Sequence, residues 1–404
     1  MIAIAHDSRI HVEGSTTMRS LTTRRTLLIR VGATGATVAL APLANMRLGA
    51  LAQAADAVQM WGVGTVTLED WSTFNEETGV DVTFTASPDV PGDIINQIMV
   101  QGAGERYDIL ASDGGIEDVM GPEGHFLPID TSKLTNWEGV PEALKSSPLI
   151  SADGTLYGIP VVYNADSFGY YPEDLGGEVD TFKVLFDDER TMGKVALEDN
   201  WLTTLPMAAT YLKGNDIAEI GNPSDMTEEE ANGVVDFLIE RKQAGQFRAL
   251  WSGWEESIDL LARKEVIAEN CWEPAVKELV NQGKDVQYAW TKEGYNKWLI
   301  GAWVLKGAEA HDNLDAVYKV LDGLLGGYYG AEIGLLRGYA TGRPDLAIQY
   351  AQDHPDQFTA EDVTALEETQ AKVEEKFAAE DFWQNANPTN RKAIEEAWQR
   401  FREA

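Results

Sequence analysis

The feature that most constrains the fold is an alternation of strand-like and helix-like segments in residues 58–111. Short apolar runs typical of strands occupy 58–62, 80–85 and 107–111, and segments with apolar residues at helical spacing separate them. Gly79 ends the first of these helices. The order β-α-β-α-β predicts a parallel, doubly wound sheet, in which ligands bind at the carboxyl ends of the strands.

Two loops follow strands of this predicted sheet and are candidates for ligand contact, 61–64 (WGVG) and 112–115 (SDGG). Ser112 or Asp113 is placed to cap a helix that begins near Ile116, which would leave N–H groups for an oxygen-bearing ligand. Capping without any ligand is the alternative interpretation.

Further elements can be predicted in the rest of the chain. Residues 227–244 form a predicted helix with a capping box at 227–230, and 299–305 form a predicted strand followed by a helix. The acidic stretch 361–380 is typical of a solvated helix. An apolar stripe at helical spacing marks the last helix, with Ile394, Ala397, Trp398 and Phe401.

An export signal is predicted at the start of the chain. Arg24 and Arg25 open a mild apolar run that extends to about Leu51, and small residues at alternate positions near 50–54 offer cleavage sites. The run contains Pro42 and many Gly and Ala residues, which disfavours a transmembrane helix. We therefore expect a cleaved twin-arginine signal peptide over 1–55 and a periplasmic mature protein.

Length, charge and cysteine content limit the class of protein. The chain of 404 residues is long enough for two lobes after signal removal. Its net charge of −34 disfavours nucleic acid as a partner and is compatible with a solvated coat or with a field that attracts cations. Cys271 is the only cysteine, so we expect neither an internal disulfide nor a lipid anchor at the signal end.

Covalent, metal and cofactor chemistry find little support in the sequence. The histidines outside the signal, His125, His311 and His354, form no spacing typical of a metal site. The sequence has neither a G-x-S-x-G elbow nor a phosphate-binding P-loop. We expect no catalytic residue, no metal and no cofactor.

Tryptophan is abundant, with twelve residues, and several lie beside glycine or carboxylates: Trp61, 251–256 (WSGWEE), 271–273 (CWE) and Trp298. Aromatic faces attract ammonium groups, and nearby carboxylates complete the neutralisation. These segments therefore predict a box for an organic cation, with core packing of the same tryptophans as the alternative.

Several segments resemble the extracellular solute-binding proteins of ABC importers, closest to the spermidine/putrescine-binding branch. The segments are 126–136 (FLPIDTSKLTN), 157–160 (YGIP) with 163–164 (YN), 291–294 (TKEG) with Trp298, 338–341 (GYAT), and 382–385 (FWQN) with the last helix. The resemblance runs from about Val58 to the C-terminus and implies a two-lobed α/β periplasmic binding protein fold. It implies lobe 1 from 56–161 plus 300–343 and lobe 2 from 162–299 plus 344–404, with crossings near Pro160 and Trp298.

The resemblance also implies a ligand-binding set: Trp61, Ser112, Asp113, Asp199, Glu269, Trp272, Trp298, Tyr339 and Gln384. Glu269 and Trp272 are alternatives for one pocket position. Two positions depart from the branch, since Ile300 and Leu202 stand where it has carboxylates. A polyamine held at both ends then loses support, while a shorter amine or another small molecule stacked on tryptophan stays open.

The implied function is transport without chemistry: a monomer closes on a small amine and docks on an ABC permease in the membrane. Two alternatives stay open. One is the same role for a sugar, an organic acid or a thiamine-like solute. The other is an exported hydrolase that uses Asp113, Asp199 or Glu269 as a paired acid and base.

Overall fold

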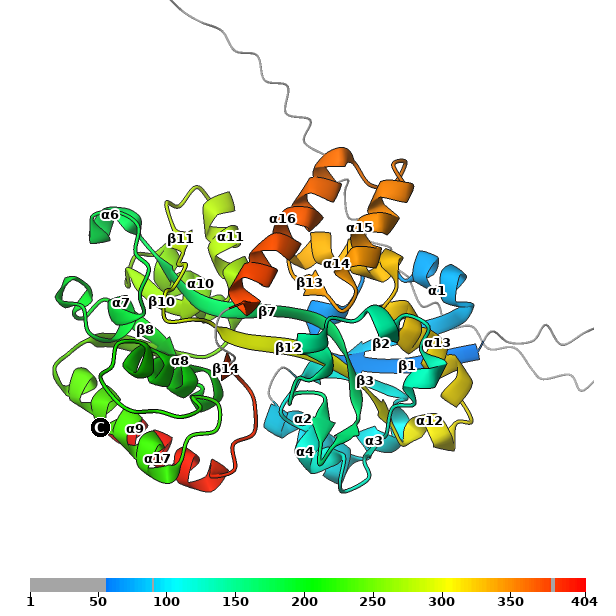
Figure 1. Ribbon diagram of the computed structural model, residues 1–404, viewed down its shortest axis with the longest axis horizontal. Helices are drawn as coiled ribbons and strands as arrows, with labels where there is room; N and C mark the ends of the chain where they lie inside the picture. The colour runs from blue at the N-terminus through cyan, green and yellow to red at the C-terminus, as the bar shows by residue number, and fades with distance from the viewer. Residues whose placement is uncertain (1–55, 89–90, 379–381) are drawn as a thin grey trace, which may run out of the picture. The chain divides into compact units, whose positions relative to one another are not determined.

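The computed structural model describes residues 56–88, 91–378 and 382–404 (Figure 1). The expected signal peptide over 1–55 lies outside these described residues. Within them, no helix is both long enough and apolar enough to span a bilayer.

The strands form one large mixed sheet in the order β2-β1-β3-β12-β7-β10-β8-β9. Their bounds are β1 Asp56–Gly62, β2 Val80–Ala86, β3 Ile109–Asp113, β7 Gly158–Tyr170, β8 Val195–Glu198, β9 Phe247–Trp251, β10 Ala268–Cys271 and β12 Asn296–Leu305. Shorter strands are β4 Phe126–Leu127, β5 Ser151–Ala152, β6 Thr155–Leu156, β11 Gln287–Tyr288, β13 Ala340–Thr341 and β14 Phe382–Trp383. β1 is parallel to β2 and β3, and β8 is parallel to β9 and β10. The predicted α/β fold with parallel strands is confirmed, once in each half of the sheet.

Two antiparallel strands, β7 and β12, connect the halves and lie side by side through the middle of the ribbon (Figure 1). β7 pairs with β12 from Gly158 to Asp166 and with β10 from Ser167 to Tyr170. The change of partner thus lies further along the chain than the crossing expected near Pro160. Because both strands are bonded on two sides, they hold the strand ends of the two halves in register.

Helices pack on this sheet. The longer ones are α1 Ser72–Thr78, α2 Pro91–Gln101, α8 Trp201–Gly214, α9 Glu228–Gln243, α10 Trp254–Ala262, α11 Glu273–Asn281, α13 Leu314–Leu324, α14 Gly327–Arg337, α15 Pro344–Asp353, α16 Ala360–Phe377 and α17 Arg391–Glu403. Single turns are α3 Ala103–Arg106, α4 Glu117–Met120, α5 Glu142–Lys145, α6 Pro172–Leu175, α7 Lys183–Phe186 and α12 Gly307–Ala310, with 3-10 turns η1 Gly64–Val66, η2 Thr131–Lys133, η3 Trp137–Gly139 and η4 Glu189–Thr191.

Local sequence signals explain where several helices begin and end. The predicted capping box of α9 is confirmed, because the Glu230 amide donates to the Thr227 hydroxyl and the Glu230 carboxylate accepts from the Thr227 amide at 2.7 Å. α1 ends at Gly79, whose φ of 67° is left-handed. The stripe of α17 is buried against α9, as its spacing predicts.

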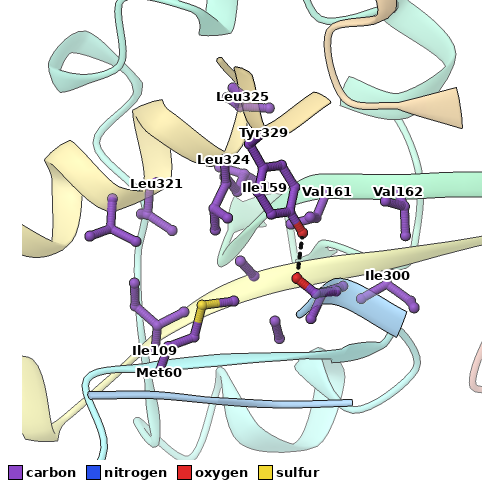
Figure 2. Packing of buried hydrophobic residues seen from close by; sticks show 14 of the residues in the cluster. Met60, Ile109, Ile159, Val161, Val162, Ile300, Leu321, Leu324, Leu325 and Tyr329 are labelled. Carbon is purple, nitrogen blue, oxygen red and sulfur yellow. Dashed lines mark hydrogen bonds between the residues drawn. The ribbon is translucent and has the colours of Figure 1, made fainter. Parts of the chain in front are cut away.

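Each half has its own apolar core. In the first, side chains of β1, β3, β7 and β12 face α13 and α14, and Figure 2 shows Met60 and Ile109 below Leu321, with Ile159 beside Tyr329. The Tyr329 hydroxyl donates to the Val66 carbonyl at 2.9 Å, which satisfies the polar atom of this buried ring (Figure 2). The second core is built from β7, β8 and β10 with α8, α9 and α17.

The C-terminal helices divide between these cores, unlike the expected grouping of 344–404. α15 and α16 pack on α14, and Val373 of α16 belongs to the first core. α17 alone among the helices after 343 packs in the second core. The reason is the apolar cluster that α14 shares with α15 and α16 through Ala331, Ala351 and Leu366.

The acidic helix α16 is solvated over much of its surface but ends in a buried cation. Lys376 is 2% exposed and forms an ion pair of 2.8 Å with Glu273 of α11. Its ammonium also donates to the Asn164 side chain at 3.3 Å and the Ala165 carbonyl at 3.2 Å. This contact fixes α16 and α11 to β7 beside its change of partner.

Candidate functional site

A cavity of about 1000 Å³ opens where strands of both halves end. It is lined by the loop after β1, the last residue of β3, the end of β8 with the start of α8, and residues of β12. The α10–α11 segment, the end of α14 and residues 384–385 complete its wall. Its place at the carboxyl ends of β1, β3 and β8 is the one expected for a ligand site of a parallel α/β sheet.

Aromatic side chains form two walls of the cavity. Trp298 and Tyr339 meet edge to face with ring centroids 4.9 Å apart. In a second group, Trp272 stacks on Trp254 at 6.1 Å and meets Trp251 edge to face at 5.0 Å. Trp254 is 44% exposed, so this pair carries apolar surface to the mouth of the cavity.

Carboxylates also line this cavity. Glu198 ends β8 and Asp113 ends β3, and both line the cavity. The Thr203 hydroxyl donates to Glu198 Oε2 at 2.6 Å, and Asn200 Nδ2 donates to Oε1 at 3.3 Å. Burial raises the pKa of Glu198 to about 7. The two hydrogen bonds lower this pKa, and the negative charges of Asp166 and Asp113 raise it further.

Asp166 of β7 stands behind the cavity wall. It is 5% exposed, and Gln384 Nε2 donates to its Oδ2 at 2.9 Å. Burial raises its pKa to about 6, while the nearby Trp298 indole, the hydrogen bond from Gln384 and the charge of Lys376 oppose the rise. The charges of Asp166 and Asp113, from strands of both halves, thus act on Glu198 at the cavity.

The C-terminal segment brings Gln384 to this place. The backbone amide of Gln384 donates to the Lys297 carbonyl at 2.9 Å, which extends the pairing of β14 with β12.

The next residue, Asn385, lies so close to Gly115 that a Cβ on that glycine would stand 1.8 Å from the Asn385 carbonyl oxygen. Gly115 also has a φ of 96°, so both its conformation and its lack of a side chain are required here.

Five of the predicted site residues line the cavity: Asp113, Trp272, Trp298, Tyr339 and Gln384. The other four lie outside the lining. Trp61 is buried against Tyr107, with stacked centroids 5.4 Å apart, and Ser112 is buried within β3. Asp199 forms an ion pair with Arg402 at 3.2 Å, and Glu269 is fully buried within β10 between β7 and β8.

Glu198 was not among the predicted site residues, although it lies next to the predicted Asp199. The available signal was its position directly after the apolar run 195–197, at the carboxyl end of a parallel strand. At the two positions where the spermidine/putrescine-binding branch has carboxylates, this chain has the apolar residues Ile300 and Leu202. Ile300 lines the cavity opposite Asp113 in the sheet, and Leu202 lies in α8.

The expectation that Ser112 or Asp113 caps the following helix is wrong, although Asp113 lines the cavity. α4 begins after Ile116 without a side-chain cap, so neither Ser112 nor Asp113 caps it. The Glu117 carboxylate accepts from the amides of Gly115 at 2.9 Å and Ile116 at 3.2 Å. These amides are therefore engaged within the loop and do not face a ligand.

Metal binding finds no geometric support in the described part of the chain. Over 56–88, 91–378 and 382–404, no three His, Cys, Asp or Glu side chains converge as ligands of one ion. The site thus offers aromatic faces, carboxylates and amides for a small organic molecule.

Comparisons with known proteins agree with this geometry. The sequence profile of the family described as "Bacterial extracellular solute-binding protein" matches residues 71–318. A putative spermidine/putrescine ABC transporter protein from Listeria monocytogenes superposes with a TM-score of 0.65 at 18% identity, covering 86% of this chain and 99% of the other.

Two further solved structures are similar over the same extent, covering 86% of this chain and 99% of each of theirs. The spermidine/putrescine substrate-binding protein PotD from Streptococcus pneumoniae, in complex with calcium and HEPES, has a TM-score of 0.66 at 14% identity. The binding protein MotA from A. tumefaciens, in complex with glucopine, has a TM-score of 0.61 at 16% identity. The fold is shared by proteins whose ligands differ.

Proposed function

Because the chain belongs to the family of bacterial extracellular solute-binding proteins, we propose that it captures a small organic cation for an ABC importer. The observation that carries the cation assignment is that Glu198 and Asp113 line the same cavity as the aromatic pairs Trp298–Tyr339 and Trp254–Trp272. Ring faces and carboxylates both attract an ammonium group, and partial burial strengthens the attraction.

The role of each residue follows from its place. Trp298, Tyr339 and Trp272 provide faces and edges for the apolar part of the ligand. Glu198 and Asp113 neutralise its charge, and Gln384 holds the third carboxylate, Asp166, in position. In this proposal four of the predicted contacts do not touch the ligand and support the fold through the packing and the ion pair described above. They are Trp61, Ser112, Asp199 and Glu269.

The proposal includes the remaining expectations from the sequence. The first lobe consists of residues 56–161 and 300–343 together with helices α15 and α16. The second lobe consists of residues 162–299 together with helix α17. The protein is exported by the twin-arginine pathway, works as a monomer in the periplasm and docks on a permease when closed around its ligand. It binds its ligand without turnover.

A thermal-shift screen of the full-length chain tests the proposal. The panel contains polyamines, short diamines, alkylamines, betaines, amino acids, thiamine and neutral sugars, each at low and high salt. A cation that binds should raise the Tm, and the rise should grow with the logarithm of its concentration. At one hundred times its Kd, the ligand adds about 2.7 kcal/mol to the free energy of unfolding. A response to sugars or acids alone would keep the transport role and refute the cation site, and formation of a product would favour the hydrolase.

A further inference from the structure

The cavity carries cations as well as carboxylates. Lys277 of α11 and Arg337 at the end of α14 line it together with Glu198 and Asp113. Arg337 donates to the carbonyl oxygens of Gly64 at 2.7 Å and Thr65 at 3.2 Å, which are neutral acceptors. Over the described residues, no carboxylate lies within ion-pair distance of Arg337 or of Lys277. Their positive charges are therefore available to a ligand.

The charged residues come from different elements. Glu198 and Asp113 stand at the ends of β8 and β3, whereas Arg337 ends α14 and Lys277 lies on α11 next to a further carboxylate, Glu278. Lys277 reaches the chain just before Tyr339, since a Cβ on Gly338 would lie 2.5 Å from the Lys277 ammonium. Both cations thus gather beside the same aromatic wall.

The pKa of Tyr339 is affected by carboxylates and by one of the two cations. Its pKa is raised first by burial and then by the charges of Asp166, Glu273 and Asp113, while the charge of Arg337 lowers it. The ring therefore lies within electrostatic range of these carboxylates and of Arg337. One more carboxylate, Glu278, lines the cavity beside Lys277, but its Oε1 accepts from Gln282 of the same helical face at 2.9 Å.

We propose that the ligand is zwitterionic, a small molecule with an ammonium group at one end and a carboxylate at the other. This deepens the proposed function and rests on it. The ammonium binds at Glu198 and Asp113, and the ligand carboxylate binds at Lys277 and Arg337. A diamine would place its second ammonium against these two cations, and a dianion would place a carboxylate against Glu198.

Calorimetric titration of the full-length chain at pH 8 with three matched series tests this proposal. The series are ω-amino acids, diaminoalkanes and alkylamines with one to six methylene groups. The best ω-amino acid should bind about tenfold more tightly than the alkylamine and the diamine of the same length, because its carboxylate adds a charge-assisted contact. A diamine or an alkylamine that binds as tightly as every ω-amino acid would overturn the proposal.

A charge-neutral variant locates the effect. Lys277→Gln should reduce the ratio of ω-amino acid affinity to alkylamine affinity by about fivefold to tenfold. Lys392→Gln is the matched control, because Lys392 is 89% exposed on α17, where it pairs with Glu396 at 3.7 Å. Equal effects of the two variants on the ratio would contradict the proposal.

Failure of the zwitterion can be told from failure of the cation site. If alkylamines bind, and bind more weakly to Glu198→Gln, while the ligand carboxylate adds nothing, the cation site stands and the zwitterion is refuted. If no member of the three series binds, both are refuted.

Discussion

Neutralising Glu198 should weaken ligand binding and change the pH dependence of stability. Glu198→Gln keeps the size of the side chain and removes its negative charge. At pH 8 we expect organic cations to bind about tenfold to a hundredfold more weakly, the range given by one charge-assisted hydrogen bond of about 1.5–3 kcal/mol. Asp113 remains in the cavity, so binding should be reduced without being abolished.

The same substitution should affect the ligand-free protein in a direction that depends on pH. Because the folded-state pKa of about 7 lies above the usual 4.5, the folded protein holds this proton more tightly than the unfolded chain. Stability therefore falls as the pH rises from about 4.5 to 7, by about 3 kcal/mol for full burial. Because Glu198 is only partly buried and lines an open cavity, solvent screening reduces this cost to about 2 kcal/mol.

Thermal unfolding between pH 5 and pH 8 measures this effect. The lost hydrogen bond from Thr203 or Asn200 costs the variant about 1 kcal/mol at either pH, whereas relief of the buried charge appears only at pH 8. The difference in Tm between variant and parent should therefore rise by about 3 °C from pH 5 to pH 8, for roughly 350 folded residues at about 2.1 cal/mol/K each.

Asp199→Asn is the matched control, because Asp199 is the adjacent carboxylate and pairs with Arg402 outside the cavity lining. It should leave cation binding within about twofold of the parent, as expected for a partly exposed ion pair. The reasoning is refuted if Asp199→Asn weakens binding more than Glu198→Gln does. It is also refuted if the Tm difference of Glu198→Gln is the same at pH 5 and pH 8.

Two further substitutions test the supports of the site by chemical denaturation. Gly115→Ala should cost about 2–4 kcal/mol, because a Cβ would meet the Asn385 carbonyl at 1.8 Å at a positive φ, whereas Gly124→Ala, with positive φ but open space, should cost about 1 kcal/mol. Lys376→Met should cost about 2–3 kcal/mol by leaving Glu273 unpaired, and adding Glu273→Gln should recover at least half; no recovery would contradict the ion-pair argument.

Much of the fold could be predicted because its signals are local. The strand and helix alternation of 58–111 and the capping box of α9 depend on neighbouring residues, and both are present in the structure. The position of α15 and α16 could not be predicted in this way. It depends on an apolar cluster with α14, a contact between segments far apart in the chain.

The site was harder to predict, since side-chain direction at a strand end depends on pairing across the sheet. In β1, Met60 faces the first core, whereas Trp61 faces Tyr107 and Leu110 on the opposite side. Sequence position alone could not distinguish these faces. The same reason separates Glu198 from Asp199, since the first lines the cavity and the second pairs with Arg402.

The position of the carboxylates is more informative for recognition than the net charge of −34. Most of that charge lies in water, where salt screens it beyond about 8 Å. Glu198 and Asp166 are instead held where water is scarce. This burial raises the pKa of Glu198 to about 7 and that of Asp166 to about 6. Their burial costs stability in the empty protein, and it strengthens their attraction for a cation for the same physical reason. A bound ammonium offsets part of that cost, so ligand binding and folding stability are coupled most strongly above pH 7.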